Sequence, residues 1–557
     1  MILGLDVGGT QTDAVLVKDG HVVAHGKTVN GADLLETLDT ALDQVLSGVD
    51  PKEVRRAVFS TTLATNAIVE DHLEPAGMIV SSGPGMDPEW FTVGPSYHVV
   101  SGCMDHRGTE VTPIDRNAVM NAVSAIKRQG IRVAGVAGKF SVRNPLHELM
   151  MSQWITDSFS YVAMGHIFSG SLNFPRRVAT TYLNAALHGV HHSFVSALEK
   201  TLTRRGITAP RYLLKPDGGT VSLSGSYRFP AQTAQSGPAA SVMGALALDG
   251  CRETALILDV GGTTTDMAIL LDGVPLCVPR GITLGEFRTS IRSLLTRSLG
   301  LGGDSRVRVD DKGCLKIGPT REGSAVAFGG PVPTPTDAMI VLRLLHAGDL
   351  KAARRAMEAV AGPLNLHPLA AAERILTNMA QTIALSAEAF LYSVNSRPVY
   401  TIHEVIECAR VAPTILIVLG GPAPMLAPYL AAAFNLPYRI PRFHDVANAV
   451  GAAAARVTTE VTLQADTQRG TAVIPEAGLE IPIRRDFSME AALSMAREIL
   501  EKRASDEGAS PDELDFAVTE KEEYSMVRGG ARVGKNIRLK LTIVPGIAPD
   551  WAEKEQC

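Results

Sequence analysis

Eight residues occur twice in the chain with a single difference. Residues 6–13 read DVGGTQTD and residues 259–266 read DVGGTTTD. The two glycines carry no Cβ, so a ligand can approach their backbone closely. Backbone N–H groups and threonine hydroxyls of such a turn can bind an anion. The leading aspartate would repel a bare phosphate, but it can hold a hydrated Mg²⁺ that bridges phosphate oxygens.

The likeness of the two copies extends beyond these residues. An apolar run precedes and follows each copy, and an Asp-Gly pair, Asp19-Gly20 or Asp272-Gly273, stands 13 residues after each leading aspartate. Asp-Gly between apolar runs is typical of a type I′ hairpin turn, whose two central residues need positive φ. Each copy therefore predicts three strands joined by two turns. The repeat predicts two similar halves.

A third glycine-rich turn occurs late in the chain. The apolar run 414–419 is followed by Gly420-Gly421 and by a helical pattern from about Ala423, with Pro422 near its first turn. Glycines are common in strand-to-helix turns, so this pattern is weak evidence by itself. After two phosphate-binding turns, we interpret it as the contact for adenine and ribose.

These features resemble the ATPase fold of actin, sugar kinases and Hsp70, and more specifically the hydantoinase A and 5-oxoprolinase family. The resemblance covers roughly residues 1–457. The matching stretches are STTLATNAIVE (60–70), NPLHE (144–148), TTYLNAAL (180–187), QSGPAASVMGA (235–245), LGGDS (301–305), GGPVPTPTDA (329–338), LGGPAP (419–424) and VANAVGAAAARV (446–457).

The resemblance implies an α/β fold with two ATPase halves, an interdomain nucleotide cleft and bound ATP with Mg²⁺. Asp6 and Asp259 are expected to hold the metal through water and to act in catalysis. Three kinds of residue complete the expected site: the phosphate-binding Gly8, Gly9, Thr10, Gly261, Gly262, Thr263 and Thr264, the turn- or water-orienting Thr12, Asp13, Thr265 and Asp266, and the adenosine-binding Gly420 and Gly421.

The activity implied by the resemblance is ATP-dependent opening of a cyclic amide such as a hydantoin or 5-oxoproline, or service as the ATPase subunit of such an enzyme. The implied partner is a hydantoinase B-like second subunit, with a homo-oligomer as an addition or alternative. An ATPase subunit of a ketone-carboxylase-like complex, a regulatory or chaperone-like ATPase and a sugar kinase are the other hypotheses. The chain departs from the family at Asp304, where a further glycine is usual, and in a shortened segment after Gly318-Pro319.

We expect a first ATPase half over residues 1–180, a second over 181–457 with an insertion at about 280–350, and a small α+β appendage over 458–557. The insertion is expected to form a solvated helix face and a hairpin. The alternative is that one or two of its arginines reach phosphates or a carboxylate substrate. These arginines are Arg280, Arg288, Arg292, Arg297, Arg306 and Arg308.

Composition excludes several classes of protein. The 557 residues carry a net charge of −5, which argues against a nucleic-acid or acidic-membrane binder. The six cysteines include no close pair, and no secretion signal or long apolar run occurs, so a cytoplasmic enzyme is expected.

Smaller clusters have simpler interpretations. His188 and His192 are spaced for one helix face but lack a third ligand, so a surface or interface role is favoured over a metal. Cys103, Asp105 and His106 are too closely spaced for three ligands on a regular element, although a metal or substrate contact is the alternative. Asp337 is expected to cap a helix rather than to act as a catalyst. Ser236 does not fit a nucleophile motif, and the Gly237-Pro238 pair after it suggests the start of a helix that approaches phosphate or crosses between lobes.

Overall fold

The computed structural model describes residues 1–31, 33–278, 280–396 and 410–552. Ala32, Cys408 and Cys557 lie outside the described residues. The chain divides into two compact units, which are Met1–Gly237 with Val278–Ser293 and Ala452–Cys557, and Pro238–Cys277 with Leu294–Gly451. The boundary expected at residue 180 falls inside helix α5, Phe174–Ala186, so the chain leaves the first unit later than expected.

The central sheet of the first unit contains the first copy of the repeat. Strands β1 and β2 pair antiparallel, with Asp6 opposite Asp13, and β4 lies parallel to β1 on the other side. The strand order is β12-β11-β4-β1-β2-β3. The strands are β1 Ile2–Val7, β2 Gln11–Lys18, β3 His21–Val29, β4 Arg56–Thr61, β11 Arg211–Leu214 and β12 Thr220–Ser222.

The sheet of the second unit has the same plan. Strands β13 and β14 pair antiparallel, with Asp259 opposite Asp266, and β21 lies parallel to β13. The order is β15-β14-β13-β21-β22, and β18 also pairs with β14. The strands are β13 Ala255–Val260, β14 Thr265–Leu271, β15 Val274–Pro275, β18 Thr296–Leu299, β21 Ile415–Leu419 and β22 Tyr438–Arg439.

Both predicted hairpin turns are confirmed. Asp19 and Gly20 have φ values of 49° and 76°, and Asp272 and Gly273 have values of 50° and 79°. Positive φ at both central residues is the requirement of the type I′ turn. The two copies of the sequence repeat therefore have the same backbone conformation at this turn. The α/β fold class is also confirmed.

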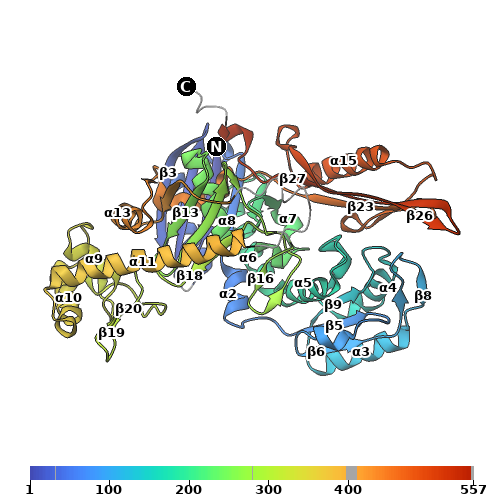
Figure 1. The fold of residues 1–557 in the computed structure, drawn as a ribbon, viewed down its shortest axis with the longest axis horizontal. Coiled ribbons are helices and arrows are strands. Elements are labelled where there is room, and N and C mark those ends of the chain that lie inside the picture. Colours follow the sequence, from blue (N-terminus) through green and yellow to red (C-terminus); the bar gives the residue numbers. More distant parts are fainter. Residues whose placement is uncertain (32, 279, 397–409, 553–557) are drawn as a thin grey trace. The chain divides into compact units, whose positions relative to one another are not determined.

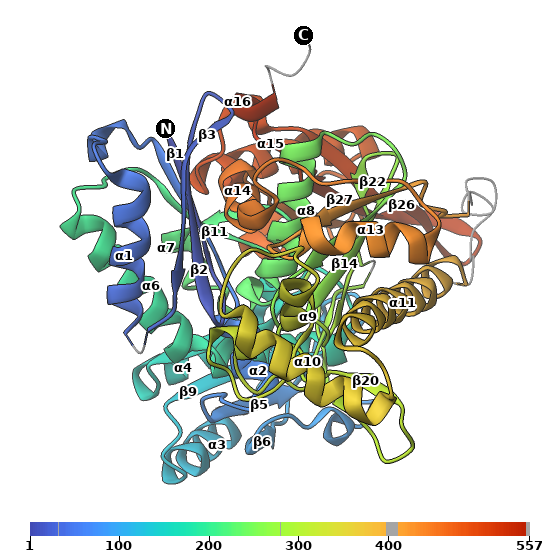
Figure 2. The ribbon, with the colours of Figure 1, turned by 90° about the vertical axis from the view of Figure 1, so that its left-hand side faces the viewer.

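Helices α1, Leu34–Leu46, and α6, His188–Arg204, lie side by side against the first sheet (Figure 2). Asp33 begins α1 by accepting a hydrogen bond of 2.8 Å from the Leu35 N–H. Leu38, Leu42 and Val45 of α1 are spaced at helical intervals and are buried in the same apolar cluster as Leu3, Leu5 and Leu198.

A second, parallel sheet in the first unit has the order β10-β9-β5-β6. Its strands are β5 Ala76–Ser81, β6 Ser96–Val99, β9 Val133–Gly138 and β10 Tyr161–Met164. Helices α3 Arg116–Arg128, α4 Leu146–Ile155 and α5 pack against it (Figure 1). The short strands β7 Cys103–Met104 and β8 Glu110–Thr112 form a separate ribbon.

The predicted α+β appendage is present at the C-terminal end. Five antiparallel strands in the order β25-β24-β23-β27-β26 pack against helix α15, Met489–Asp506 (Figure 1). The hairpin of β26 Phe516–Arg528 and β27 Ala531–Ile543 turns at Gly529-Gly530, as expected. Glutamates neutralise its basic side chains: Glu520 pairs with Arg538 at 2.8 Å and Glu523 with Lys535 at 2.7 Å. The other strands are β23 Glu460–Asp466, β24 Thr471–Ile474 and β25 Leu479–Pro482.

The expected insertion is only partly as predicted. No helix forms over residues 280–325, all of which the structure describes; short strands β16 Thr283–Leu284, β17 Phe287–Arg288, β18, β19 Val307–Val309 and β20 Leu315–Ile317 occur instead. The expected hairpin is present as β19 and β20. The segment contains many glycines and β-branched residues, which disfavour a helix.

Helices surround the second sheet. They are α8 Ser236–Asp249, α9 Pro335–Val341, α10 Leu350–Leu364, α11 Pro368–Asn395, α13 Ala423–Phe434 and α14 Ala447–Ala454. Helices α9, α10 and α11 pack together (Figure 2) and share one apolar core with β13 and β21. No described helix has the length and apolar character needed to cross a membrane.

Candidate functional site

The first glycine turn connects β1 to β2 and is closed by its own backbone. The Gly8 N–H donates to the Gln11 carbonyl at 3.0 Å. Asn30 braces the turn: its side chain donates to the Gly8 carbonyl at 2.7 Å and accepts from the Thr12 hydroxyl at 2.8 Å. Gly9 and Thr10 are exposed at the tip. Thr12 is therefore part of the support of the turn.

The aspartate that precedes this turn is held by a serine. Asp6 is 8% exposed, and the Ser60 hydroxyl donates a hydrogen bond to its carboxylate. Ser60 lies at the end of β4, beside the end of β1. Asp13 is instead paired with Lys27 at 3.4 Å. The two aspartates of the copy thus have different neighbours despite lying opposite each other in the hairpin.

The second glycine turn connects β13 to β14 and repeats the backbone closure. The Gly261 N–H donates to the Thr264 carbonyl at 2.9 Å. The LGGDS segment lies against this turn, because the N–H groups of Gly303 and Asp304 donate to the carbonyls of Gly261 and Gly262 at 2.9 and 2.7 Å. The side chain of Thr265 is buried and donates to the Leu301 carbonyl at 2.6 Å.

A serine also holds the second leading aspartate. The Ser241 hydroxyl lies 2.5 Å from the Asp259 carboxylate and 2.9 Å from the side-chain oxygen of Asn448. Asp259 is half-buried, whereas Asp6 is buried. The Ser298 hydroxyl donates to Asp266, the aspartate opposite Asp259. Both copies therefore present a leading carboxylate oriented by a serine hydroxyl.

Asp304 places a carboxylate next to the second turn. A Cβ built on Gly262 would lie 2.9 Å from its Oδ2 atom, and Arg321 pairs with that oxygen at 3.2 Å. Burial raises the pKa of Asp304, and the charge of Arg321 opposes this increase. The residue that departs from the family pattern thus contacts a predicted phosphate-binding loop.

The late Gly-Gly turn adjoins the end of β13. Gly420 has φ of 92°, and a Cβ there would lie 2.1 Å from the Val260 carbonyl oxygen and 2.9 Å from Asp259 Oδ1. Gly421 is different, because a Cβ at that position would have no atom within 4 Å. Gly420 is required by the backbone, whereas Gly421 faces open space that a ligand can use.

The structure brings the predicted residues together within each unit. In the second unit, Gly261, Gly262, Asp259 and Gly420 adjoin one another; in the first, Asp6 and the Gly8–Thr10 turn lie at one strand end. Their predicted roles, and the cleft between the halves, remain predictions. Sequence reasoning missed four supporting residues, which are Asn30, Ser60, Ser241 and Asn448. The last three lie in the stretches that carry the family resemblance.

Other clusters have structural roles. Among the described residues, no group of three or more His, Cys, Asp or Glu side chains could hold a metal ion. The ring of His188 stacks on Tyr161 with centroids 4.2 Å apart. The four described cysteines form no disulfide. Thr334 is the N-cap of α9, and Asp337, expected to be the cap itself, is the third helical residue that completes the capping box.

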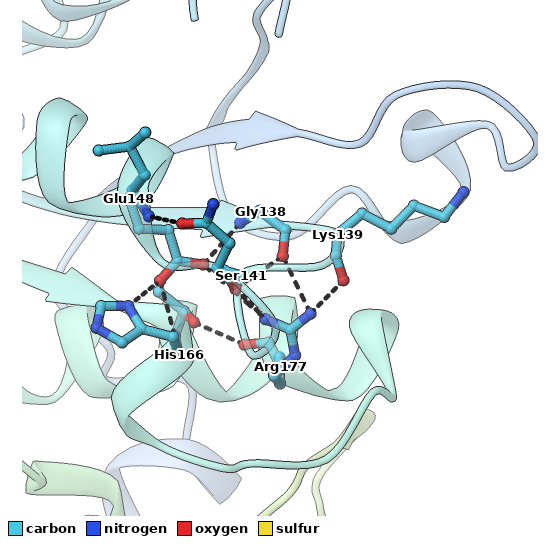
Figure 3. A network of polar contacts seen from close by, with 9 residues as sticks. Gly138, Lys139, Ser141, Glu148, His166 and Arg177 are labelled. Atoms are coloured by element: carbon cyan, nitrogen blue, oxygen red, sulfur yellow. Dashed lines mark hydrogen bonds and ion pairs between the residues drawn. The ribbon is translucent and has the colours of Figure 1, made fainter. Parts of the chain in front are cut away.

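The NPLHE stretch supplies a buried network rather than a ligand site (Figure 3). Glu148 has 0% exposure and accepts hydrogen bonds from the Gly138 N–H at 2.7 Å and the His166 Nδ1 at 2.6 Å. Arg177 donates to Ser141, to the Gly138 carbonyl at 3.0 Å and to the Lys139 carbonyl at 2.6 Å. The network fixes the loop that follows β9.

Comparisons with known families cover most of the chain. Residues 2–159 match the family described as the hydantoinase/oxoprolinase N-terminal region, and residues 177–461 match the family described as hydantoinase/oxoprolinase.

Two curated relatives are each 25% identical to this chain. The match to the caprolactamase subunit alpha of Pseudomonas jessenii covers 69% of this chain and 59% of that protein. The match to the acetophenone carboxylase gamma subunit of Aromatoleum aromaticum covers 67% and 58%. The chain thus spans about three fifths of the length of these relatives.

Two solved structures have the same fold. A nucleotide-free acetone carboxylase structure aligns with a TM-score of 0.72 and 18% identity over 99% of this chain and 88% of that chain. The ATP-dependent caprolactamase structure from Pseudomonas jessenii aligns with a TM-score of 0.69 and 20% identity over 98% and 87%. These neighbours therefore share the fold of this chain over nearly its whole length.

Proposed function

The chain belongs to the hydantoinase/oxoprolinase family, and from this membership we propose that it is an ATP-dependent enzyme, or an ATPase subunit, that opens a cyclic amide. The observation that carries the proposal is the pair of matched glycine turns, each preceded by an aspartate that a serine hydroxyl orients. One such turn is a common hairpin; two turns with the same supporting contact favour phosphate binding as the function of both.

The residues fit Mg²⁺ with ATP. Mg²⁺ is usually held by one or two carboxylates, substrate phosphates and retained water, so a larger cluster of protein ligands is not needed. Asp6 and Asp259 would supply these carboxylates. Ser60 and Ser241 each donate a hydrogen bond to one carboxylate, which fixes its orientation. The bound metal would supply neutralisation of phosphate charge.

The glycine turns would position the phosphates. Backbone N–H groups at Gly8–Thr10 and Gly261–Thr263 can donate to phosphate oxygens without side-chain interference. ATP would supply a phosphoryl group to the amide oxygen, which makes that oxygen a good leaving group. The protein's contribution to such a transfer is mostly orientation and stabilisation of charge. Support for a cyclic amide substrate comes from the relative named as a caprolactamase subunit.

A second candidate function is the ATPase subunit of a ketone carboxylase. It is favoured by the relative named as an acetophenone carboxylase subunit and by the fold shared with acetone carboxylase. The product distinguishes the candidates: an amide hydrolase releases phosphate and an opened ring, whereas a carboxylase fixes bicarbonate carbon. A sugar kinase would release a stable phosphorylated product, and a regulatory ATPase would respond little to any small amide.

The test measures ATP turnover in Asp6→Asn and Asp259→Asn. Loss of a metal-orienting carboxylate should lower kcat by about a hundredfold or more, since positioning and charge stabilisation account for such factors. Asp310→Asn, at the exposed β19–β20 turn, is the matched control and should retain wild-type turnover. Near-normal turnover in both Asp6→Asn and Asp259→Asn, with Mg²⁺ as the metal, would refute the assignment of these carboxylates.

A further inference from the structure

A small polar cavity lies within the first unit, and none of its lining residues belongs to the glycine turns. Its volume is about 70 Å³, whereas one buried water needs about 10 to 15 Å³. The cavity can therefore hold several waters or one small molecule. Segments 215–221, 290–292 and 458–460 form part of its wall, together with side chains from α15.

Much of the wall is a preformed polar framework. The Lys215 Nζ donates to the Thr458 carbonyl at 2.6 Å and lies 3.6 Å from Asp217. Asp217 also accepts from the Gly219 N–H at 3.0 Å and the Thr458 hydroxyl at 3.1 Å. These groups satisfy one another and are nearly buried, so the wall has a defined shape before any ligand binds.

Two side chains on the wall make no hydrogen bond to a described residue, although one of them, Arg292, is paired by charge with Asp217. The guanidinium of Arg292 makes no hydrogen bond to another described residue, and its Nε atom lies 4.0 Å from Asp217. The side chain is 26% exposed, so it is accessible from the cavity it lines. The Ser290 hydroxyl oxygen is buried and has no hydrogen-bond partner among the described residues. Unsatisfied buried donors carry a free-energy cost that a ligand or water removes.

The chemistry of the wall selects the ligand. A guanidinium and a hydroxyl two residues apart in sequence suit a carboxylate, which can accept a hydrogen bond from each. Phe168, Phe229 and Ile291 supply apolar surface for a short hydrocarbon segment. Burial raises the pKa of Glu507 on the same wall, with Lys215 and Arg503 opposing the rise, so this residue repels an anion less strongly.

We propose that this cavity binds a small organic carboxylate, with the carboxylate held by Arg292 and Ser290. The ligand class includes plain carboxylates and amino acids, whose ammonium group could pair with the carboxylate of Glu460 on the same wall. The inference does not depend on ATP or on the proposed function, because the cavity belongs to one unit and involves none of the proposed catalytic residues.

Calorimetry on the full chain without ATP tests the proposal with butanoate, 4-aminobutanoate and the neutral analogue butanamide. We expect saturable binding of at least one carboxylate and much weaker binding of butanamide. Preference for 4-aminobutanoate would identify an amino-acid site, whereas preference for butanoate would identify a plain carboxylate site. Arg292→Ala should weaken binding by about tenfold to a hundredfold, and Arg292→Lys by less.

Arg288→Ala is the matched control, since Arg288 is exposed in the same segment and does not line this cavity. It should bind like the wild type. Ser290→Ala removes one hydroxyl and serves as a second probe should Arg292→Ala unfold, which thermal melting would detect. The proposal is overturned when neither carboxylate binds the wild type, when butanamide binds equally well, or when both Arg292→Ala and Ser290→Ala retain wild-type affinity.

Discussion

Residues of the same type at the glycine turns differ in backbone conformation, in the space around them and in burial, and their sequence motif does not show these differences. Gly420 has positive φ and no room for a Cβ, whereas its neighbour Gly421 has open space around it. Asp6 and Asp259 occupy equivalent positions but differ in burial. Residue type alone therefore predicted the local turn, while the contacts around each residue decide whether it serves the fold or a ligand.

Gly421→Val places a branched side chain in the open space where we propose that the nucleotide lies. The variant should fold normally and raise the KM for ATP by about tenfold, with a smaller change in kcat, because the phosphate-binding turns are unaltered. Steady-state kinetics and calorimetry measure both effects. Gly420→Ala is the contrasting variant and should lower stability, since its Cβ would lie 2.1 Å from the Val260 oxygen. Unchanged ATP affinity in Gly421→Val would move the adenosine site elsewhere.

Asp304→Asn removes a negative charge beside the second glycine turn and frees Arg321 from its ion pair. We expect ATP to bind about three- to tenfold more tightly, because a carboxylate near bound phosphate is repulsive. Calorimetric titration of the wild type and the variant at equal ionic strength provides the comparison. Weaker binding by the variant would show that Asp304 assists the nucleotide instead.

At the scale of elements, the close packing of two helices accounts for two of the stretches that carry the family resemblance. In the second unit, helices α8 and α14 approach so closely that a Cβ on Gly244 would lie 2.1 Å from the Ala447 oxygen. A Cβ on Gly451 would likewise lie 2.0 Å from the Ala240 oxygen. The same helices carry Ser241 and Asn448, which hold Asp259. Close helix packing thus places the supporting side chains.

Gly244→Ala should lower the free energy of unfolding by about 3 kcal/mol, the upper end of typical overpacking costs. Gly362→Ala in α10 is the matched control, because a Cβ there meets no atom within 4 Å. The control should be neutral or slightly stabilising, since alanine favours a helix over glycine. Denaturant titration compares the two variants, and equal stability would contradict the close contact.

The network around Glu148 makes the free energy of unfolding depend on pH in the acid range. Burial alone would raise the pKa of Glu148, but the hydrogen bond and charge of His166, with the charge of Arg177, lower it below 4.5. A lowered folded-state pKa contributes stability that is present above about pH 4.5 and is lost as the pH falls through the lowered value.

Glu148→Gln should therefore be less stable than the wild type at pH 7, by about 3 kcal/mol, because it leaves Arg177 and His166 without a buried carboxylate. Its stability should fall less steeply below pH 4.5 than that of the wild type. Urea unfolding between pH 3 and pH 7 measures the free energy of unfolding of both proteins. If that free energy changed with pH equally in the two proteins, Glu148 would be excluded as a source of the pH dependence.

At the scale of the whole molecule, the sequence predicted the class of fold, the two similar sheets and the α+β appendage, because repeated motifs and hairpin turns are local signals. It did not predict which segments share a compact unit. Residues 278–293 and 452–557 join the first unit through contacts between segments distant in sequence. The solvated helix expected in the insertion at about 280–350 does not form over residues 280–325, where short strands pair instead.

The proposed reaction requires more than the nucleotide-binding residues. We expect the isolated chain to hydrolyse ATP slowly and with poor coupling to ring opening, because water must be directed to an activated carbon inside a closed site. Adding a hydantoinase B-like partner should raise both rates together. Coupled phosphate-release and product assays with the chain alone and with the partner test this dependence. Stoichiometric ring opening by the chain alone would refute it.

The long β26 strand has a consequence for behaviour at high concentration. It forms one edge of the appendage sheet, and its 13 residues leave a row of backbone groups open to another strand. An edge of this kind can act as a template for aggregation. The four consecutive charged residues at 520–523 oppose close pairing of two such edges, because the pairing would remove these charges from water. Replacing these four residues with neutral ones should therefore lower the colloidal stability of the protein.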